Sequence, residues 1–448
     1  MPSRLAVLFA EAGFELYLVG GSVRDLLLGR QAADYDFATD ARPEDIKKVI
    51  AGVADAVYDV GESFGTIGFR RSRHTYEVTT YRSEAYRGDS RKPLVAFSDD
   101  IAEDLSRRDF TVNAMALRLP DPVMVDPFGG LTDLAERVLR TPLSPEISFG
   151  DDPLRMLRLF RFMSQLGFSG DPGAVSAVAE MAGRLGVVSA ERIRDELVRL
   201  LVGPHVEEAL TAVVDTGLAA EFMPEVADLA LARDPMHRHK DVLAHTIAVV
   251  GKISPVKTLR LAALFHDVGK PATRAYGPEG VTFHHHEVVG ARLARERLRA
   301  LRFSKDIVAG VSRLVFLHMR PHTYKMGWTD RAVRRYVRDA GPLLLELNEL
   351  VRSDVTTRNP KRERAISSRI DELERRIDEL RLQEELDRIR PPIDGHDVMA
   401  HLGIGPGPAV GRAMEMLLEK RLDEGPFSVE EAYRVLDEWA AGPAPDGV

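Results

Sequence analysis

Cysteine is absent from the 448 residues of the chain. Neither disulfides nor thiolate metal sites are possible, which favours a cytosolic setting. No apolar run approaches the length of a membrane span, and residues 1–9 lack the charged start and long apolar core of a signal peptide. We therefore expect a cytoplasmic protein that does not bind a membrane.

An excess of positive charge is also missing, since 61 lysine and arginine residues stand against 69 aspartate and glutamate residues, for a net charge of −8. This balance argues against nucleic-acid binding over the whole surface. Arginine is nevertheless clustered in three stretches, Arg155–Arg161, Glu191–Arg194 and Arg331–Arg338. A local basic track of this kind is what an enzyme that visits RNA transiently needs.

The length of the chain exceeds what one hydrophobic core supports, so we expect about three or four domains. Its 44% hydrophobic and 29% charged residues are typical of a soluble globular protein.

A predicted anion site lies near the start of the chain. Residues 16–19 form a predicted buried strand, and Gly20-Gly21 after it permit a tight turn and a close approach to a ligand. The helix that follows presents its N-terminus to this turn, and Arg24 adds a cation suited to a triphosphate.

The same helix has predicted caps at both ends. Ser22 is expected to cap residues 23–28, with Asp25 completing a capping box, and Gly29 is expected to end the helix.

Two carboxylates follow in the next predicted strand, where Asp34 and Asp36 are separated by one aromatic residue. Positions i and i+2 of a strand face the same side, so both can hold the same Mg²⁺ ions. Taken alone, the glycine pair is an ordinary turn and the aspartates a solvated edge. Their combination at this spacing favours a functional site.

The stretch Leu18–Asp40 resembles motif A of the polymerase-beta type of nucleotidyltransferase. More narrowly, it resembles bacterial class II CCA-adding tRNA nucleotidyltransferases and the related poly(A) polymerases. The resemblance implies that Asp34 and Asp36 carry the Mg²⁺ ions that activate a primer 3′-OH and neutralise the leaving pyrophosphate. It also implies an α+β fold, with a mixed-sheet head followed by all-α neck, HD and tail domains.

The rest of the head is predicted as a helix and a strand over residues 41–60 and a hairpin over residues 64–81. Glu77 in the hairpin is a candidate third catalytic carboxylate, or alternatively a cross-strand partner of an arginine. Residues 83–100 are polar and are expected to form an irregular, mobile loop beside the site.

Residues 105–117 carry Arg107, Arg108 and Asp109 before an apolar segment that we predict to be helical. They resemble the family's motif B, which implies that Arg108 contacts nucleotide phosphate, Asp109 holds a ribose hydroxyl and Asn113 supports the pocket. The alternative is a helix-start aspartate with solvated arginines. Residues 125–134 resemble motif C, to which we assign a positioning role.

An amphipathic helix is predicted over residues 151–162, beginning at Pro153. Asp152 and Arg155 are three apart and are expected to share one face. A carboxylate accepts a hydrogen bond from the exocyclic amine of C or A, and a guanidinium donates to the neighbouring ring nitrogen, whereas U and G present the opposite polarity. One such pair can therefore select CTP and ATP without a template.

The alternative for this helix is a surface ion pair with solvated arginines. That arrangement leaves Arg155, Arg158 and Arg161 at like-charge spacing with no anion between them, so we favour nucleotide binding by all three. The stretch resembles motif D of the family, except that Asp151 stands where the family has glutamate. The helix predicted over residues 188–201 resembles motif E, and in it Glu191, Arg192 and Arg194 either orient the base-reading pair or belong to a plain structural helix.

The chemistry changes from about residue 234 onward. His245, the adjacent His266-Asp267 pair and Asp354 resemble the HD phosphohydrolase signature, which places metal ligands on three helices, with Gly269-Lys270 ending the helix of the His-Asp pair. By the same resemblance, His286 and His318 occupy positions that hold a second ion in larger HD sites. We expect a divalent metal there, of a kind that the sequence leaves open.

One long charged helix is predicted over residues 361–390, with an apolar seam of Ile366, Ile370, Leu373, Ile377 and Leu380. After Pro391-Pro392 the chain resembles the family tail, where a GxGPxxG turn at a helix start can meet RNA phosphates. Residues 442–448 are expected to be disordered.

These observations predict a catalytic head over residues 1–140, a helical neck over 141–230, an HD domain over 231–360 and a long helix with an RNA-contacting tail over 361–448. The predicted function is addition of CMP, CMP and AMP from CTP and ATP to a tRNA 3′ end, with a second phosphohydrolase activity in the HD domain. Two alternatives stay open: a poly(A) polymerase or a partial, CC- or A-adding enzyme, and an HD phosphohydrolase whose head only binds RNA. The oligomeric state is left open.

Overall fold

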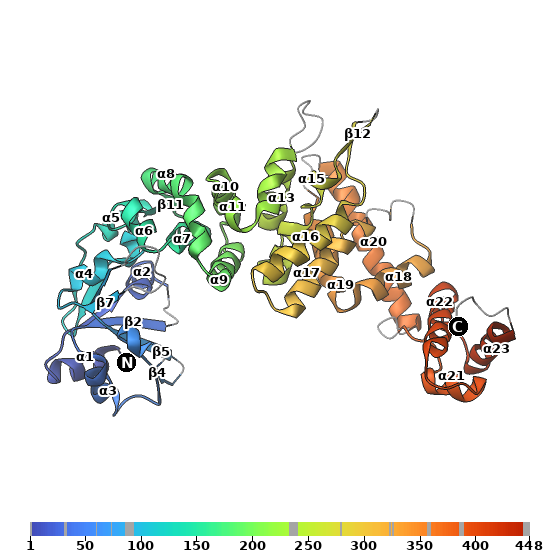
Figure 1. Ribbon diagram of the computed structural model, residues 1–448, viewed down its shortest axis with the longest axis horizontal. Helices are drawn as coiled ribbons and strands as arrows, with labels where there is room; N and C mark the ends of the chain where they lie inside the picture. Colours follow the sequence, from blue (N-terminus) through green and yellow to red (C-terminus); the bar gives the residue numbers. More distant parts are fainter. Residues whose placement is uncertain are drawn as a thin grey trace. The chain divides into compact units, whose positions relative to one another are not determined.

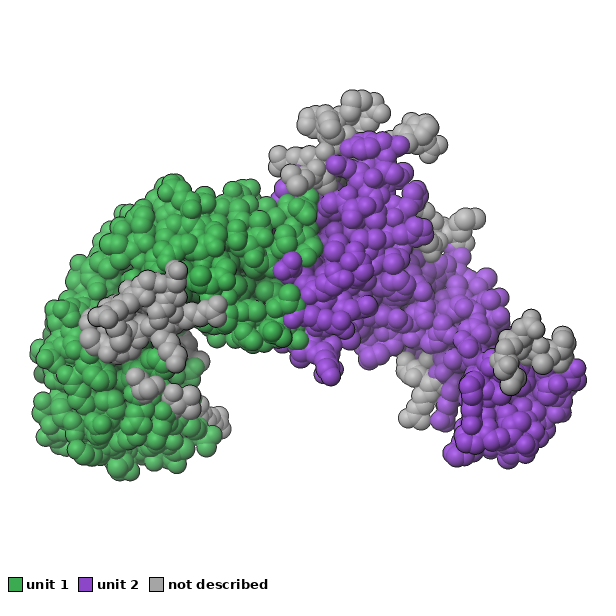
Figure 2. Space-filling model, viewed as in Figure 1, with its two compact units in different colours: residues 1–228, 300–303 green, residues 229–299, 304–448 purple. Residues whose placement is uncertain are grey.

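The computed structural model describes residues 2–30, 34–59, 61–72, 74–85, 94–232, 241–277, 280–321, 324, 327–355, 360–384 and 389–441. The chain forms two compact units, one of residues 1–228 with 300–303 and one of residues 229–299 with 304–448 (Figure 2). Across these described ranges, no helix combines the length and the apolar character that a membrane span requires.

A mixed seven-stranded sheet organises the head of the first unit (Figure 1). Its order is β3-β4-β5-β2-β1-β8-β9, in which β2 and β5 are parallel and the other neighbours are antiparallel. The strands are β1 (Leu16–Val19), β2 (Asp34–Thr39), β3 (Ala56–Tyr58), β4 (Thr66–Arg71), β5 (His74–Thr80), β8 (Ala116–Leu119) and β9 (Val123–Val125). The predicted strands at residues 16–19 and 34–39 and the predicted hairpin are confirmed.

The helices of the head are α1 (Pro2–Glu11), α2 (Gly21–Leu27), α3 (Pro43–Ile50), α4 (Ile101–Ser106) and α5 (Gly130–Glu136), with the 3₁₀ turns η1 (Glu62–Phe64) and η2 (Thr111–Asn113). All four residues of β1 are buried, as expected for a strand with neighbours on both sides and packing on both faces. Tyr17 and Val19 of this strand share a core cluster with Tyr81 and Leu105. The central strands that carry the site are therefore held rigidly.

Two predictions for the head were wrong. The apolar segment after Asp109 is not a helix but the turn η2 and the strand β8, which pairs with β1. Alternating side chains of β8 can then pack on the sheet, and this tertiary pairing overrides helix propensity. The loop predicted over residues 83–100 contains a two-stranded ladder of β6 (Arg82–Ala85) and β7 (Leu94–Phe97), and residues 86–93 lie outside the described residues.

The neck of the first unit is helical apart from a short parallel pairing of β10 (Val138–Leu139) with β11 (Ser169–Gly170). Its helices are α6 (Pro145–Asp151), α7 (Leu154–Leu166), α8 (Pro172–Met181), α9 (Ala190–Leu201), α10 (Val206–Asp215), α11 (Leu218–Phe222) and α12 (Pro224–Ala227), with the 3₁₀ turn η3 (Ala182–Val187). The 3₁₀ turn η4 (Asp228–Ala232) begins at the last residue of this segment and continues into the second unit. Helix α7 packs against α9 and α10, which buries Leu157 and Phe160 completely. This packing fixes the face of α7 that carries the predicted arginines.

The second unit is also mainly helical. Its elements are α13 (Val242–Lys252), α14 (Lys257–Phe265), α15 (Lys270–Thr273), a hairpin of β12 (Ala275–Gly277) and β13 (Gly280–Thr282), α16 (His286–Ala300), α17 (Lys305–Leu317), α18 (Asp330–Ala340), the 3₁₀ turn η6 (Gly341–Leu343), α19 (Leu344–Ser353), α20 (Pro360–Glu384), α21 (Gly395–Leu402), α22 (Pro408–Glu424) and α23 (Val429–Ala441). The fold class is confirmed, with the two short pairings β10-β11 and β12-β13 as additions to the parts predicted to be all helical.

The predicted apolar seam is found on α20, where Ile370, Leu373, Ile377 and Leu380 are buried beside α18 and α19. The side chain of Ile366, residues 385–388 of the predicted helix and the terminal residues 442–448 lie outside the described residues.

The third arginine cluster is not a free basic track. Arg331 and Arg335 of α18 lie 2.6 Å and 3.2 Å from the Asp423 carboxylate of α22, and Arg335 also pairs with Glu419. Arg334 is buried and donates to the carbonyl oxygen of Leu422 at 3.1 Å. These arginines join the tail to α18, and acidic residues about 90 positions later neutralise part of the charge from which an RNA track was predicted.

Candidate active site

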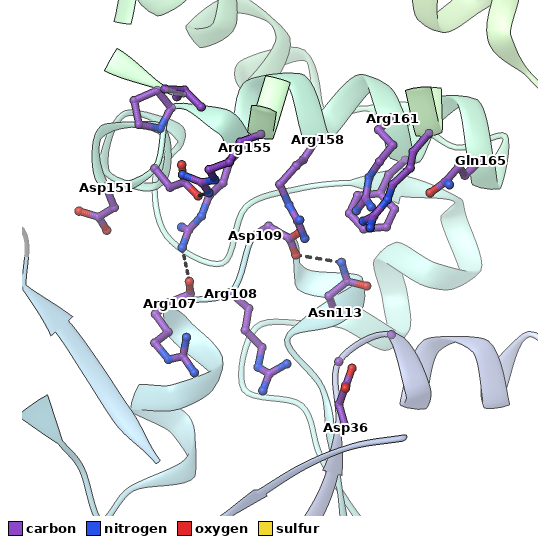
Figure 3. Close-up of a pocket in the computed structure, with 18 of the residues that line it drawn as sticks. Asp36, Arg107, Arg108, Asp109, Asn113, Asp151, Arg155, Arg158, Arg161 and Gln165 are labelled. Atoms are coloured by element: carbon purple, nitrogen blue, oxygen red, sulfur yellow. Dashed lines mark hydrogen bonds and ion pairs between the residues drawn. The ribbon is translucent and has the colours of Figure 1, made fainter. Parts of the chain in front are cut away.

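A cavity of about 1390 Å³ in the first unit brings together the ends of β1 and β2, the start of α2, the segment around Arg108 and the face of α7 (Figure 3). Figure 3 shows the α7 arginines on one side and Asp36 and Arg108 on the other. Of the residues predicted for the head site, the cavity is lined by Gly20, Gly21, Arg24, Asp34, Asp36, Arg108, Asp109, Asn113, Asp152, Arg155, Arg158 and Arg161. Ser22 and Glu77 are not part of the lining.

Ser22 does not cap α2. The helix begins at Gly21 with Gly20 as the N-cap residue, so Ser22 lies inside its first turn. The Ser22 hydroxyl donates to the carbonyl oxygen of Asp34 at 3.2 Å and accepts from the backbone N–H of Asp36 at 3.1 Å. The predicted capping box was therefore wrong, because the hydroxyl is used to tie α2 to the strand that carries both carboxylates.

The carboxylates gather on one face of the sheet. Asp34 and Asp36 lie two apart on β2, and Asp36 is the register partner of Glu77 on the parallel strand β5. On its other side Glu77 faces Gly68, so its cross-strand neighbour is a glycine and not an arginine. Three carboxylates on adjacent positions of one face form an oxygen-only ligand set, which suits Mg²⁺.

Electrostatics within this group favour a cation. Burial raises the pKa of Asp36, Arg108 lowers it and Asp34 raises it again, with a net upward shift. Burial, Asp36 and Asp34 each raise the pKa of Glu77. Mutual repulsion of this kind is relieved by a bound divalent ion, so the residues present fit the Mg²⁺ that the motif implies.

Glycine is strongly favoured at position 20 of this site. Its φ of 68° is in the region that favours glycine, and a Cβ placed on it would lie 2.7 Å from Nη1 of Arg108. The guanidinium of Arg108 thus crosses directly over the backbone turn. Asp104, which is buried, holds it there at 3.0 Å and holds Arg107 at 2.6 Å.

Asp109 is the centre of a buried network in the cavity wall. Its Oδ1 accepts from Asn113 Nδ2 and from the backbone N–H of Phe110, both at 2.9 Å, and its Oδ2 accepts from Nε of Arg158 at 2.9 Å. Burial raises the pKa of Asp109, but Arg158 and Asn113 outweigh it and hold that pKa well below the ordinary value. Asp109 is therefore ionised and firmly oriented.

The network continues in both directions. Asn113 Oδ1 accepts from Arg24 Nη1 at 2.6 Å, and Arg24 also pairs with Asp25 at 2.8 Å. At the other end, Glu196 of α9 lies 3.4 Å from Nη1 of Arg158 and 2.9 Å from Nε of Arg161. A chain of charged and polar side chains thus connects α2 to α9 across the whole cavity.

Glu196 was missed by the sequence analysis, which found no anion between the α7 arginines. Asp109 and Glu196 are those anions, and both are buried. The available signal was helical spacing in residues 188–201, where Glu196 falls on the apolar side beside Ile193, Leu197 and Leu200. A glutamate among buried positions indicates a buried cationic partner.

Asp152 does not lie on the helix of Arg155, contrary to the prediction. It follows α6 with an extended backbone (φ −137°, ψ 99°), and α7 begins two residues later at Leu154. Its Oδ1 accepts from the backbone N–H of Leu154 at 3.1 Å, which uses the aspartate as a helix-start residue, while Oδ2 pairs with Arg192 of α9 at 2.8 Å. Asp152 and Arg155 still line the same cavity.

Of the three residues named on α9, only Arg192 lies at the cavity and contacts Asp152. Arg194 pairs with its neighbour Asp195, and Glu191 is exposed. In motif C, Asp126 accepts from the backbone N–H groups of Gly130 and Leu131 at 2.6 and 2.9 Å, which orders the turn that follows the sheet.

A second cluster of ligands lies in the second unit. His245 is on α13, the His266-Asp267 pair is in the turn after α14, and Asp354 directly follows α19. The expectation that the pair lies on a helix was wrong, since α14 ends at Phe265. The turn instead brings both buried side chains close to the other ligands. Nε2 of His245 lies 2.8 Å from Asp354 Oδ1 and 3.6 Å from Asp267 Oδ2.

Three imidazoles of this cluster are oriented in the same way. Nδ1 of His266, His286 and His318 each meets the carbonyl oxygen of the residue three positions earlier, at 2.7, 2.8 and 2.6 Å. A backbone partner on Nδ1 leaves Nε2 of a neutral ring as a free lone pair, which is the usual arrangement of a metal-binding histidine.

Asp267 lies between two groups of ligands. One group contains His245 and His266 on its Oδ2 side, at 3.6 and 3.2 Å, and the other contains His286 on its Oδ1 side, at 3.5 Å, together with His318. Within each group the ligand atoms lie within 4.8 Å of one another. Four imidazoles with two carboxylates suit a transition metal more than Mg²⁺, and the bridging position of Asp267 allows for two ions.

Burial lowers the pKa of His318 to about 3, so this ring is neutral and available as a ligand. Burial also lowers the pKa of His266, but Asp267 and Asp354 outweigh it and raise that pKa to about 10. The carboxylates thus favour positive charge at the centre of the cluster, which a metal ion would supply.

Family models match three parts of the chain. "Poly A polymerase head domain" matches residues 16–140, "Probable RNA and SrmB-binding site of polymerase A" matches residues 167–229, and "HD domain" matches residues 242–376. The sheet with its carboxylates, followed by the His-Asp cluster, therefore defines a nucleotidyltransferase head joined to an HD domain.

Similar proteins narrow the family assignment of the chain. An A-adding tRNA nucleotidyltransferase of Deinococcus radiodurans is 33% identical over 443 residues, which is 94% of this chain and 95% of that protein. A CCA-adding enzyme of Lactobacillus johnsonii is 42% identical over 225 residues, 49% of this chain and 55% of that enzyme, so the chain spans about half the length of this relative. The chain belongs to the tRNA nucleotidyltransferase family, as its motifs predicted.

Solved structures agree with this assignment. The CCA-adding enzyme of Bacillus stearothermophilus in complex with CTP is similar with a TM-score of 0.71 and 26% identity, over 98% of this chain and 96% of that one. The Thermotoga maritima CCA-adding enzyme complexed with tRNA shares the fold with a TM-score of 0.59 at 18% identity, over 98% and 94% of the two chains.

Proposed function

We propose that this protein adds nucleotides to the 3′ end of tRNA, transferring CMP, CMP and AMP from CTP and ATP and releasing pyrophosphate. One observation carries the proposal: a single cavity is lined by the Asp34 and Asp36 carboxylates, by the arginines of motifs B and D, and by the pair Asp152 and Arg155. A nucleoside triphosphate needs these three kinds of group for its reacting phosphate, its negative charge and its base.

In the proposed reaction the tRNA 3′-oxygen attacks the α-phosphorus of the triphosphate, and the bond from that phosphorus to the bridging oxygen of the pyrophosphate breaks. Mg²⁺ held by Asp34 and Asp36, with Glu77 nearby, would lower the pKa of the attacking hydroxyl and neutralise the leaving group. Ser22 keeps the strand of these carboxylates fixed to the start of α2. Gly20, Gly21, Arg24 and Arg108 hold the triphosphate at this turn, where backbone N–H groups and two guanidinium groups lie together.

Asp109 accepts a ribose hydroxyl in this proposal, with Asn113 and Arg158 keeping its carboxylate in place. A carboxylate on the 2′-OH would select ribonucleotides, because a deoxyribonucleotide leaves it without that donor. Asp152 and Arg155 read the base edge, as an acceptor for the amine of C or A and a donor to the adjacent ring nitrogen. The guanidinium carbon of Arg161 lies 3.9 Å from the centre of the Phe162 ring, so a cation stacked on an aromatic ring lines this end of the cavity.

Partial activity is the nearest alternative, because the relative that matches over almost the full chain is named as A-adding. A poly(A) polymerase is a further alternative, although an enzyme that uses ATP alone has no need of a pair that accepts both C and A. A head that only binds RNA would not need to keep the half-buried Asp36 beside Asp34, since that arrangement is electrostatically unfavourable without a cation.

Extension of three tRNA substrates separates these alternatives. The substrates end before the CCA, after the first C and after the second C, and each is incubated with one labelled nucleoside triphosphate and Mg²⁺. Incorporation of CMP on the first two and AMP on the third supports the proposal. AMP on the third substrate alone would reduce the activity to A addition, and long AMP tails would identify a poly(A) polymerase.

A test of base reading uses the same assay. Asp152→Ala and Arg155→Ala are expected to lose the preference for CTP and ATP over UTP and GTP, whereas the control Asp195→Ala, at an exposed position of α9, keeps it. Incorporation of UTP or GTP by the unchanged protein at rates near those of CTP and ATP would refute the base-reading role.

We also propose that the HD cluster is a metal-dependent phosphohydrolase site, in which His245, His266 and Asp354 would hold one ion and His286 and His318 a second, with Asp267 lying between the two groups. Its substrate would be a phosphoester such as a 2′,3′-cyclic phosphate or a 2′-nucleotide, and Lys270, 2.5 Å from Asp267 Oδ2, provides a cation for the phosphate. Phosphate release from 2′,3′-cyclic AMP with Mn²⁺ or Ni²⁺, abolished in Asp267→Ala and kept in the exposed control His285→Ala, would support this activity. Silence across a broad panel of phosphoesters would leave the cluster a structural metal site.

A further inference from the structure

The guanidinium of Arg155 is anchored by three oxygen atoms, and two of them belong to Ser148 of α6. Arg155 Nη1 donates to Ser148 Oγ at 2.9 Å and to the Ser148 carbonyl oxygen at 3.4 Å. Nη2 donates to the carbonyl oxygen of Arg107, a bond drawn in Figure 3. Ser148 is 1% exposed and Arg155 is 8% exposed, so water does not compete effectively for these bonds.

Ser148 also contacts the other member of the base-reading pair. Its carbonyl oxygen accepts the backbone N–H of Asp152 at 3.3 Å, at the point where α6 ends and the chain becomes extended. Asp152 and Arg155 therefore share one support, although Asp152 lies outside the helix that carries Arg155. The Ser148 hydroxyl is the part of this support that depends on the side chain.

An arginine needs such an anchor to discriminate between bases. Its guanidinium has five N–H groups and rotates about several bonds, so only a fixed plane presents its donors in one direction. When the guanidinium of Arg155 is fixed in this way, its N–H groups face the ring N–H of G or U, and two donors then oppose each other. Released from the anchor, it can turn away, and the penalty against the wrong base is then lost.

We infer that Ser148 is a positioning residue that fixes Arg155 for base selection. This inference rests on the proposed function, because it assumes that Arg155 reads the base. It assigns to Ser148 no contact with the nucleotide and no part in the phosphoryl transfer, since the carboxylates of β2 are held separately by Ser22.

Ser148→Ala is the direct test, with AMP and GMP incorporation measured on tRNA ending in CC and CMP and UMP incorporation on tRNA lacking the CCA. The ratio of kcat/KM for ATP over GTP, or for CTP over UTP where the protein adds C, is expected to fall about tenfold. That factor corresponds to about 1.4 kcal/mol, in the range of one hydrogen bond to a charged group. The change is expected mainly in KM, with kcat for the correct nucleotide within about twofold of the unchanged protein.

The matched control is Ser144→Ala in the same helix. Ser144 is exposed and accepts the backbone N–H of Ile147 at 3.4 Å as the N-cap residue of α6, so its loss weakens the helix without touching Arg155. The control is expected to keep both ratios. Ser148→Cys is a second variant for the case that Ser148→Ala does not fold. Cysteine is nearly the size of serine but its sulfur is a poor acceptor, so this variant is also expected to lower both ratios.

Arg155→Ala separates failure of this inference from failure of the proposed function. If Arg155→Ala removes base selection and the Ser148 variants keep it, the positioning role of Ser148 is overturned while the base-reading role stands. If Arg155→Ala also selects normally, the base-reading role itself is wrong. A fall in selectivity of the same size in Ser144→Ala would likewise overturn the inference, because it would assign the effect to the stability of α6.

Discussion

Replacement of Glu196 by glutamine tests the buried network that orders the arginines of the cavity. Glu196 is 5% exposed, and it is the carboxylate that contacts Nε of Arg161 at 2.9 Å and Nη1 of Arg158 at 3.4 Å. Glutamine keeps the shape of the side chain and removes its charge. Arg158 retains Asp109 as a partner, so the unbalanced charge falls on Arg161.

The expected cost follows from the burial of that charge. Burial and the neighbouring Arg158 lower the pKa of Arg161 to about 10, against the raising effect of Glu196, so Arg161 stays protonated near neutral pH. Removing one partner of a buried pair costs about 3–5 kcal/mol, and we expect the lower end, since the glutamine oxygen can still accept the hydrogen bond that Arg158 Nη1 donates to Glu196 at 3.4 Å. For a unit of this size, about 3 kcal/mol corresponds to a fall of roughly 6–12 °C in the melting temperature of the first unit.

The shift is measured as the tRNA extension activity that remains after heating to a series of temperatures. Glu191→Gln, at an exposed position of the same helix, is the control. A second variant that replaces Arg161 by methionine in addition to Glu196→Gln removes both charges and is expected to regain part of the lost stability. The reasoning is refuted if Glu196→Gln melts at the same temperature as the unchanged protein, or if the double variant is no more stable than Glu196→Gln alone.

Two further predictions concern acid stability and metal binding. Burial raises the pKa of Asp104, but the neighbouring Arg108 and Arg107 lower it by more, so the pKa in the folded protein lies below the ordinary value. A carboxylate with a lowered pKa stabilises the fold above its unfolded pKa of about 3.9, and this stability is lost as the pH falls through the folded pKa. Asp104→Asn is therefore expected to flatten the loss of stability below pH ~4 in circular dichroism, and an unchanged acid profile would count against this role. In the second unit, Asp267→Ala is expected to lose Mn²⁺ or Ni²⁺ binding in calorimetry while His285→Ala keeps it, and equal binding by the two variants would contradict the bridging position of Asp267.

Elements with strong local signals could be predicted from the sequence. The strand at residues 16–19, the turn at Gly20 and the aspartate strand follow from a short apolar run, a glycine pair and period-two spacing. The six candidate HD ligands followed from the resemblance to the HD signature, and the structure brings these residues, spread from His245 to Asp354, together in one cluster. For the strands and the turn, by contrast, the residues that decide the structure are close together in the chain.

The errors concern contacts between distant residues. Ser22 was assigned to its own helix, but its hydroxyl bonds to a strand that begins twelve residues later. Glu196 lies 38 residues after Arg158, and the acidic partners of Arg335 lie 84 and 88 residues after it. Local spacing carries no record of such pairs, so the arginine clusters were interpreted as free cations when several of them are neutralised within the fold.

Asp152 lies in the cavity expected for it, although the local structure predicted for it was wrong. The prediction placed it on the helix of Arg155, whereas it stands in the extended residue before that helix and is fixed by Leu154 and Arg192. Both side chains line the same cavity because the chain turns between α6 and α7, and not because of helical spacing. The residue types thus predicted a shared site, and the tertiary structure supplies the geometry that places both side chains in one cavity.

The most direct test of the account is nucleotide transfer by Asp34→Ala and Asp36→Ala, measured as incorporation of labelled CTP and ATP into tRNA lacking its 3′ CCA, with Asp45→Ala on α3 as the control carboxylate. We predict that both variants lose incorporation by at least about a thousandfold while they fold and melt like the control. Extension of the tRNA at an undiminished rate by either variant would contradict the claim that these two carboxylates hold the catalytic ions.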